Sequence, residues 1–157
     1  ADVNARNECR QTPLHYASIR GHIEIIKLLL ENKADVNAEE IWDDTPLHLA
    51  SDLNHLDIVK LLLNKDANVN AKNSNSYTPL HYASRADNLE IVKLLVEHGA
   101  RLNSLNISNR KPIHLTEDKE VKRYLYNAKK MMDKRIIHSY FWVIVHNNKL
   151  NKRDNEN

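Results

Sequence analysis

TPLHYA, at residues 12–17, is the stretch that decides the fold, because close copies of it return along the chain at a fixed distance. Each copy starts 33 residues after the one before it. The copies are TPLHYA from Thr12, TPLHLA from Thr45, TPLHYA from Thr78 and KPIHLT from Lys111. A second motif, of the form ADVNA, repeats in phase with the first from residues 1, 34, 67 and 100. Two motifs in phase indicate an array of repeated structural units.

Each TPLH segment has the residues that begin a helix. Thr12 can cap the helix, and Pro13 then takes the first helical position, where its missing N–H costs nothing. His15 follows three residues after the cap and can reach back to it, as the glutamate of a capping box does. The later segment HIEIIKLLL, from His22, and its two copies have apolar residues at helical spacing. These segments predict a second helix that is buried between neighbouring repeats.

Two positions in each repeat are predicted to adopt a left-handed backbone and end a helix. The first helices end at Gly21, Asn54 and Asp87, and the second helices end at Lys33, Asp66 and Gly99. A left-handed lysine is expected to cost roughly 1 kcal/mol relative to glycine.

The sequence resembles the ankyrin repeat family through TPLH[YL]A, [HN][IL][ED]I[IV]KLL[LV] and A[DNR][VL]N[AS]. The resemblance implies an all-α repeat solenoid, in which helix–loop–helix units stack and short β-hairpin tips project to one side. We expect a repeat array over residues 1–126. It divides into a partial repeat at 1–6, full repeats at about 7–39, 40–72 and 73–105, and a truncated closing repeat at 106–126. Lys111 replaces the capping threonine there, which predicts a shortened first helix.

The period is lost after residue 126. We expect an added helix at residues 127–146 that caps the open end of the fourth repeat, and a disordered tail at 147–157, where apolar residues are almost absent. The apolar run Ile136 to Val145 is too short to cross a membrane. A monomer is expected. Two alternatives stay open, self-association through Ile136 to Val145 and attachment to a membrane surface. The basic residues that favour the latter are Lys129, Lys130, Lys134 and Arg135.

The sequence predicts no catalytic, metal or cofactor site. The histidines of the TPLH segments lie one repeat apart, too far from one another to share an ion. No HExxH, GxxxxGK[ST] or GxSxG motif occurs. Cys9 has no neighbour in sequence that would make its thiol reactive. The acidic residues Glu39, Glu40, Asp43 and Asp44 are interpreted as a solvated loop.

Charge gives no indication of nucleic acid as a partner. Residues 1–126 carry 16 Lys and Arg against 18 Asp and Glu, and the positive surplus is confined to the residues that follow. No leader for secretion is visible, and a single cysteine fits a reducing compartment. We therefore expect a cytoplasmic protein.

What remains is binding to a protein partner. In the ankyrin family, scaffold positions repeat and variable positions recognise, so the resemblance places the contact surface on the tips and on the concave face made by the first helices. Trp, Tyr and Arg carry most of the energy of protein interfaces. The predicted contact residues are Arg20, Ile41, Trp42, Asp44, Leu53, Tyr77, Arg85 and Arg110. The alternative for Trp42 is that its indole folds back onto its own hairpin or the next repeat.

Further roles rest on the resemblance and on composition. The resemblance implies that Asn37 can be a hydroxylation acceptor, although the same asparagine serves mainly to satisfy the turn. The chain could also be the substrate-recruiting part of a larger enzyme. Frequent Asn, Lys and Ile with scarce Gly, Ala and Pro are typical of AT-rich genomes. Many ankyrin proteins of intracellular bacteria and large DNA viruses share that composition, so an effector delivered into a host cell is another alternative.

Overall fold

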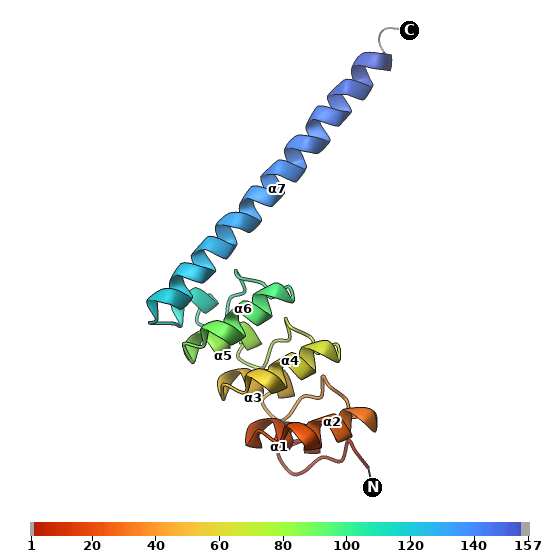
Figure 1. Ribbon diagram of the computed structural model, residues 1–157, viewed down its shortest axis with the longest axis vertical. Helices are drawn as coiled ribbons and strands as arrows, with labels where there is room; N and C mark the ends of the chain where they lie inside the picture. Colours follow the sequence, from red (N-terminus) through yellow and green to blue (C-terminus); the bar gives the residue numbers. More distant parts are fainter. Residues whose placement is uncertain (1, 155–157) are drawn as a thin grey trace. The chain divides into compact units, whose positions relative to one another are not determined.

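A computed structural model describes the backbone of residues 2–154 and the side chains of residues 2–139. It divides into two compact units, Ala1–Lys122 and Arg123–Asn157. Within the first unit, helices come in pairs at the period of the sequence motifs. The pairs are α1 (Pro13–Arg20) with α2 (Ile23–Glu31), α3 (Pro46–Asp52) with α4 (Leu56–Asn64), and α5 (Pro79–Arg85) with α6 (Leu89–Glu97). The pairs stack side by side in chain order (Figure 1). The predicted helical solenoid is therefore confirmed.

The first helices pack in one row, α1 on α3 and α3 on α5, and the second helices pack in another, α2 on α4 and α4 on α6. The core lies between the two rows and between successive pairs. It holds the apolar side chains that recur at the repeat period, such as Leu14, Leu47 and Leu80, all fully buried. Since each pair contacts only its neighbours, stability comes from the interfaces between repeats.

The histidine of each TPLH segment joins two repeats. In the first repeat, the backbone N–H of Thr12 donates to Nδ1 of His15 over 3.1 Å, so Nδ1 carries no proton and the neutral ring holds its proton on Nε2. Nε2 then donates to the carbonyl of Asp44 in the next repeat over 3.0 Å. His48 and His81 repeat both contacts. Burial lowers the pKa of all three histidines. The histidine of the predicted cap thus also forms a hydrogen bond that links two repeats.

The left-handed backbone predicted at the ends of the second helices is present. The φ angle is 65° at Lys33, 61° at Asp66 and 89° at Gly99. The chain then turns, and the asparagine of the ADVNA motif ties the turn to the following repeat. Asn37, for example, donates from Nδ2 to the carbonyl of Asp66 over 3.4 Å and accepts from the N–H of Asn68 over 2.7 Å.

Lys33→Gly is expected to raise the free energy of unfolding by about 0.5–1 kcal/mol, because the left-handed strain of a side chain outweighs the greater entropy of an unfolded glycine. Equilibrium denaturation by urea measures the change. Gly99→Ala is the matched control, since an added Cβ there would meet no atom within 4 Å. It should lower stability by a similar amount, and a gain at Gly99 would contradict the strain argument.

The predicted β-hairpin tips are not formed, because the residues that the structure describes contain no strand. The tip of the second repeat is a turn closed by two backbone hydrogen bonds, Glu40 N–H to the Asp44 carbonyl and Asp43 N–H to the Glu40 carbonyl. Asp43 adopts a left-handed φ of 61°, as do the equivalent residues of the other tips. A turn this short leaves no room for a ladder of paired strands.

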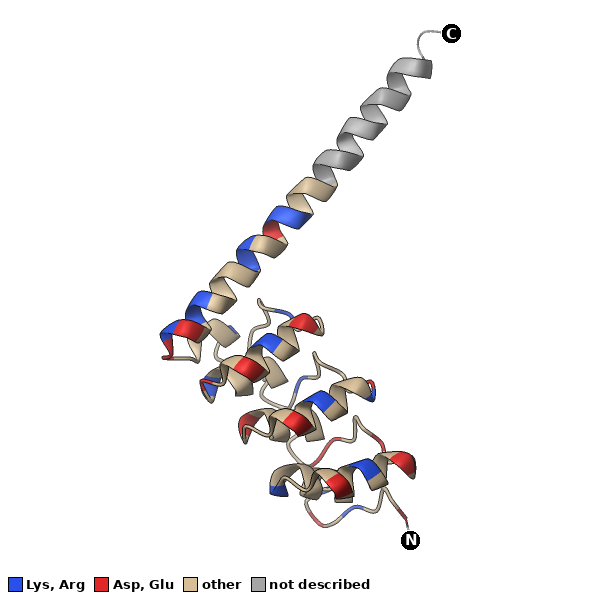
Figure 2. Cartoon of the chain, viewed as in Figure 1, with Lys and Arg blue, Asp and Glu red and all other residues tan. Residues whose placement is uncertain are grey.

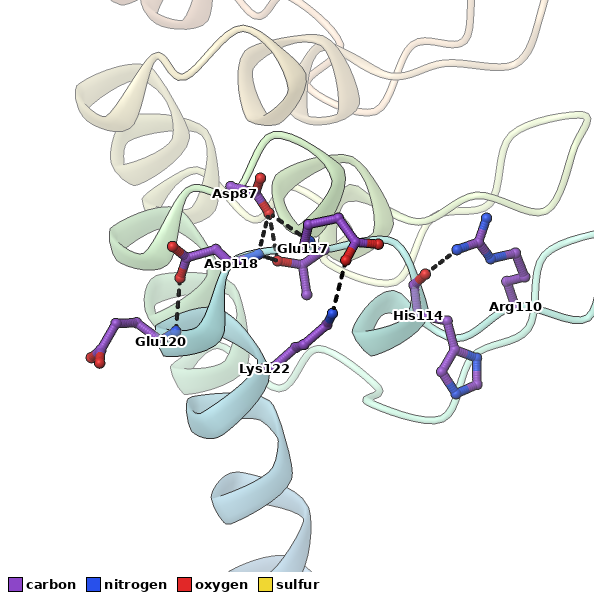
Figure 3. A network of polar contacts seen from close by, with 8 residues as sticks. Asp87, Arg110, His114, Glu117, Asp118, Glu120 and Lys122 are labelled. Atoms are coloured by element: carbon purple, nitrogen blue, oxygen red, sulfur yellow. Dashed lines mark hydrogen bonds and ion pairs between the residues drawn. The ribbon is translucent and has the colours of Figure 1, made fainter.

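The fourth repeat departs from the others. Its first helix is reduced to a single 3₁₀ turn, η1 (Pro112–His114). Asp87, at the end of the preceding first helix, holds the connection that follows (Figure 3). Its carboxylate accepts from the Thr116 hydroxyl over 2.5 Å and from the backbone N–H groups of Glu117 and Asp118. The bond from Thr116 is the main reason that the pKa of Asp87 is lowered.

The last helix, α7 (Lys119–Asp154), is continuous through the predicted helix at residues 127–146. The backbone of residues 147–154, assigned above to the disordered tail, continues this helix, and residues 155–157 lie outside the described part of the chain. Side chains of the apolar run Ile136 to Val145 are described only as far as Ser139. The capping role of this segment and its alternatives therefore stay predictions. Through Asp154, no described helix is both long and apolar enough to cross a membrane.

Candidate functional site

The candidate site begins at the tips, where one side chain per repeat shapes the turn. In the third repeat, Oδ1 of Asn73 accepts from the N–H groups of Asn75 and Tyr77, over 3.0 and 2.9 Å. Asn7 and Asn106 do the same in their own repeats. In the second repeat a glutamate takes this place: Oε1 of Glu40 accepts from Trp42 N–H over 2.7 Å and from Asp44 N–H over 3.3 Å. Glu40 is buried, so it belongs to the turn and not to a solvated acidic loop.

Successive tips are tied to one another through their backbones. Ile41 N–H donates to the Cys9 carbonyl over 3.0 Å, and Ser74 N–H donates to the Trp42 carbonyl over 3.0 Å. The Ser74 hydroxyl adds bonds to the Trp42 carbonyl, 2.7 Å, and to the Asp43 carboxylate, 2.8 Å. The backbone at Ile41 and Trp42 is therefore held from both neighbouring repeats.

The side chains on this fixed backbone are turned to solvent. Trp42 is 65% exposed and Ile41 is 47% exposed. Ile107, two tips further along the stack, is also largely exposed. Two large apolar residues that adjoin on a rigid turn form a patch that can exclude water against a partner without first losing backbone freedom.

A second group lies on the row of first helices. The Arg85 guanidinium lies over the Tyr82 ring, 4.7 Å from its centroid, and 6.0 Å from the centroid of Tyr77. It also donates to the Asp52 carboxylate over 2.8 Å. Asp52 and Arg85 occupy the same position in adjacent repeats, so the pair spans the repeat interface. The structure thus brings together two of the predicted contact residues, Tyr77 and Arg85, and adds Tyr82 to them.

Asp44 lies inside the stack, with 8% of its surface exposed. Its carboxylate accepts from Asn73 Nδ2 over 2.9 Å and from the Tyr82 hydroxyl over 3.1 Å. Burial raises the pKa of Asp44, and burial together with the Asp44 charge raises the pKa of Tyr82. Asn106 stands at the repeat position of Asn73, but Tyr77 stands where Asn73 finds Asp44. Among the described residues, Nδ2 of Asn106 therefore has no hydrogen-bond partner. Asp44 therefore joins repeats, and we leave it out of the proposed contact surface.

The other predicted residues are dispersed. Arg20 ends α1 and Leu53 follows α3, and both are exposed. Arg110 is exposed as well, and its guanidinium donates to the carbonyl of His114 (Figure 3). Asn37 is exposed but committed to the turn by the two hydrogen bonds given above. Within residues 2–139, none of these four residues makes a side-chain contact with the groups around Trp42 and Tyr77.

These groups offer apolar contact area, a guanidinium stacked on an aromatic ring, and hydrogen-bonding groups. Within the described part of the chain, no three His, Cys, Asp or Glu side chains gather where they could hold a metal ion. Cys9 is an exposed free thiol at the first tip. The buried histidines already use both ring nitrogens in the scaffold contacts.

Sequence reasoning missed Glu40 and Tyr82. The signal for Glu40 was present, since it falls at the repeat position of Asn7, Asn73 and Asn106. Tyr82 could not be separated from Tyr16, which stands at the same repeat position, because only the neighbouring repeat supplies the carboxylate that Tyr82 contacts.

Comparison with known proteins matches the chain to a protein family. A family model described as ankyrin repeats in three copies matches residues 1–73, 38–106 and 68–135, which together cover most of the chain. No curated protein matches the chain.

Proposed function

The chain belongs to the ankyrin repeat family, whose members are in general protein–protein interaction modules, and from that premise we propose that it binds a protein partner through the tip patch, Ile41 and Trp42. The group of Tyr77, Tyr82 and Arg85 is proposed as a second contact region. The single observation that carries the proposal is the exposure of two adjoining large apolar side chains on a backbone held from both sides.

Interface physics supports this choice of residues. Trp, Tyr and Arg are the residue types most often found as energetic hot spots, and Trp and Tyr bury a large area for few rotatable bonds. Arg85 is already oriented by Asp52, so little further freedom is lost when it meets a polar group of the partner. Ile107 is a further exposed apolar residue on the line of tips, separated from the patch by Ser74 and Asn75 of the third repeat.

The charge distribution favours a protein over a nucleic acid. In each second helix, the acidic residue of the first turn has a lysine three positions later, and Figure 2 shows both signs on α2, α4 and α6. These pairs are Glu24 with Lys27 at 2.8 Å, Asp57 with Lys60 at 3.9 Å, and Glu90 with Lys93 at 3.1 Å. A face of alternating sign offers no continuous positive strip for phosphates.

The family is typically non-catalytic, and we propose no reaction for this chain. A cytoplasmic, monomeric protein remains our expectation from composition. The roles as the recruiting part of a larger enzyme or as a host-directed effector concern which partner is bound, and the tip patch serves each of them equally.

Replacing Ile41 by serine and Trp42 by alanine together is expected to weaken binding of the partner at least about tenfold, because both changes remove apolar contact area at the centre of the patch. The protein is immobilised, captured partners are identified, and the affinity of each is then measured by titration. Because the two side chains are exposed and the backbone bonds do not need them, the unfolding midpoint should stay the same.

Leu28→Ala is the matched control, since Leu28 is as exposed as Trp42 but lies on α2, in the row of second helices. It should leave binding unchanged. Equal affinities for the double variant and the original chain would show that the tip patch is not the contact surface. Tyr77→Ala is a poorer probe, because Tyr77 contacts His81 and Tyr82 and its loss would disturb the fold.

A further inference from the structure

The part of α7 whose side chains are described carries a concentration of positive charge. Residues 123–139 contain five Lys and Arg against one acidic residue, Asp133, and blue predominates over red on this part of the helix in Figure 2. The second helices of the repeats differ, because their lysines are paired with acidic residues one turn earlier. Within residues 2–139, the basic residues of α7 that make no ion pair include Lys129, Lys130, Lys134 and Arg135.

Large apolar side chains on the same stretch of helix are turned to solvent. Met131 and Ile137 are each 68% exposed and Ile136 is 54% exposed. The sequence continues with YFWVIV at residues 140–145, and no Lys, Arg, Asp or Glu occurs between Arg135 and Lys149. Leaving an uncharged segment of this composition in water is unfavourable, so residues 136–145 require a partner that removes them from it.

Basic residues stand on both sides of this apolar segment. Residues 129–135 precede it, and Lys149, Lys152 and Arg153 follow it before the next acidic residue, Asp154. Because the backbone of α7 is helical over Lys119–Asp154, these three sections follow one another along a single helix. At 1.5 Å per residue the apolar segment is about 15 Å long, half of the roughly 30 Å of a hydrocarbon core. Its length therefore suits a helix that lies in the surface of a membrane.

The charge and the spacing disfavour a second copy of the chain as the partner. Two copies of α7 would bring basic sections against each other in either relative direction, because almost no acidic residue is present to pair with them. A coiled coil also needs one apolar seam. The exposed apolar residues instead come as the adjacent pairs 131–132 and 136–137, whose members point about 100° apart on a helix.

We propose that residues 129–153 bind the surface of a membrane that contains anionic lipids. Residues 136–145 enter between the head groups, and the basic residues on either side contact lipid phosphates and carboxylates. The long stems of Lys and Arg let their charged ends reach the head groups while the helix sinks toward the acyl chains. This binding is separate from the proposed contact of the tip patch with a protein partner.

Vesicle flotation with the full chain tests the proposal. One set of vesicles is pure phosphatidylcholine, and in the other about a third of the lipid is phosphatidylserine. The chain is expected to float with the anionic vesicles at about 0.15 M salt and to bind them at least about tenfold less at about 0.5 M salt, because salt screens the attraction. Flotation with the neutral vesicles should be at least about tenfold weaker as well.

Two variants of α7 separate the contributions of charge and apolar area. Changing the four basic residues of the segment 129–135 to glutamine should weaken binding to the anionic vesicles at least about tenfold. Ile136→Gln together with Ile137→Gln keeps the charge and should weaken binding by a similar factor. The matched control removes four positive charges from the repeats, through Lys27→Gln, Lys60→Gln, Lys65→Gln and Lys93→Gln, and should leave vesicle binding unchanged.

Three results would overturn the proposal. The first is no flotation of the original chain with the anionic vesicles. The second is equal binding by the original chain and the variant without the four basic residues of α7. The third is a dimer in sedimentation that Ile136→Gln with Ile137→Gln dissociates and that excludes vesicle binding, because a second copy of α7 would then cover the apolar segment.

Discussion

Ile58→Ala is expected to lower the free energy of unfolding by about 3–4 kcal/mol, whereas Ile25→Ala should lower it by only about 1 kcal/mol. The two isoleucines stand at the same position of the same helical segment, HIEIIKLLL in one repeat and HLDIVKLLL in the next. Ile58 is 3% exposed, so alanine leaves a cavity between two repeats. Ile25 is half in water, so alanine removes less buried surface and leaves no enclosed cavity.

Equilibrium unfolding in urea measures both losses, with the slope of each transition compared to confirm that the same surface is exposed. Each of the two substitutions is the control for the other. The change in helix propensity is the same at equivalent positions, so it cancels in the difference between the two free energies. Ile91→Ala, at a fully buried site, should behave as Ile58→Ala does. Equal losses at Ile25 and Ile58 would mean that Ile25 is covered in solution, and would contradict its exposure in the first helix pair.

Acid is expected to destabilise the repeat stack progressively as the pH falls from 6.5 toward 4, through protonation of the buried histidines. Burial lowers the pKa of His48 from 6.5 to about 4, and it lowers the pKa values of His15 and His81 in the same direction. Between these values the unfolded chain binds protons that the folded chain does not, so stability is full above pH 6.5 and falls as the pH falls toward 4. His48 alone accounts for a loss of roughly 3 kcal/mol.

The geometry gives the reason for this sign. A proton on Nδ1 of His48 would meet the Thr45 N–H, which already donates to that atom over 3.1 Å. Charging the ring therefore breaks a cap and places a cation in a buried site. Asp44 acts in the opposite direction, since burial raises its pKa and protonation favours the folded state as the pH falls. Protonation of Asp44 therefore offsets part of the stability loss caused by the histidines, and only at the lowest pH values of this range.

His48→Gln separates the histidine contribution. Glutamine at this position of a capping box can still accept from the cap N–H, but it does not titrate. The variant should be less stable at neutral pH, because the bond to the Tyr77 carbonyl is lost. Its free energy of unfolding should fall less steeply with pH between 6.5 and about 4. The difference in slope should correspond to nearly one proton fewer taken up on unfolding. The same steepness in both proteins would show that His48 is not the group that takes up the proton.

Much of the fold could be predicted from local patterns that repeat. Thr12, Pro13 and His15 form a cap whose chemistry lies within four residues, and the left-handed φ at Lys33 follows from its place after the second helix. The tips were predicted less well. Turn closure by Glu40 replaces strand pairing there, and this closure depends on one side-chain oxygen reaching two N–H groups.

The candidate site could be predicted only in part. Ile41 and Trp42 are distinguished by being large and apolar at positions where the other repeats carry polar residues, and the structure leaves both exposed. Asp44 was assigned to the same surface, but the Asn73 amide and the Tyr82 hydroxyl, from the following repeat, draw it into the stack. No pattern within its own repeat indicates this.

Local sequence is enough to predict the helix pairs, the caps and the left-handed ends, because each of these rests on interactions between residues a few positions apart. The tertiary structure alone decided which members of an equivalent set are covered. Ile25 and Ile58 have similar neighbours in sequence but different neighbours in space, as do Tyr16 and Tyr82. Burial in a solenoid comes from the adjacent repeat, 33 residues away, so it cannot be read from the segment that is buried.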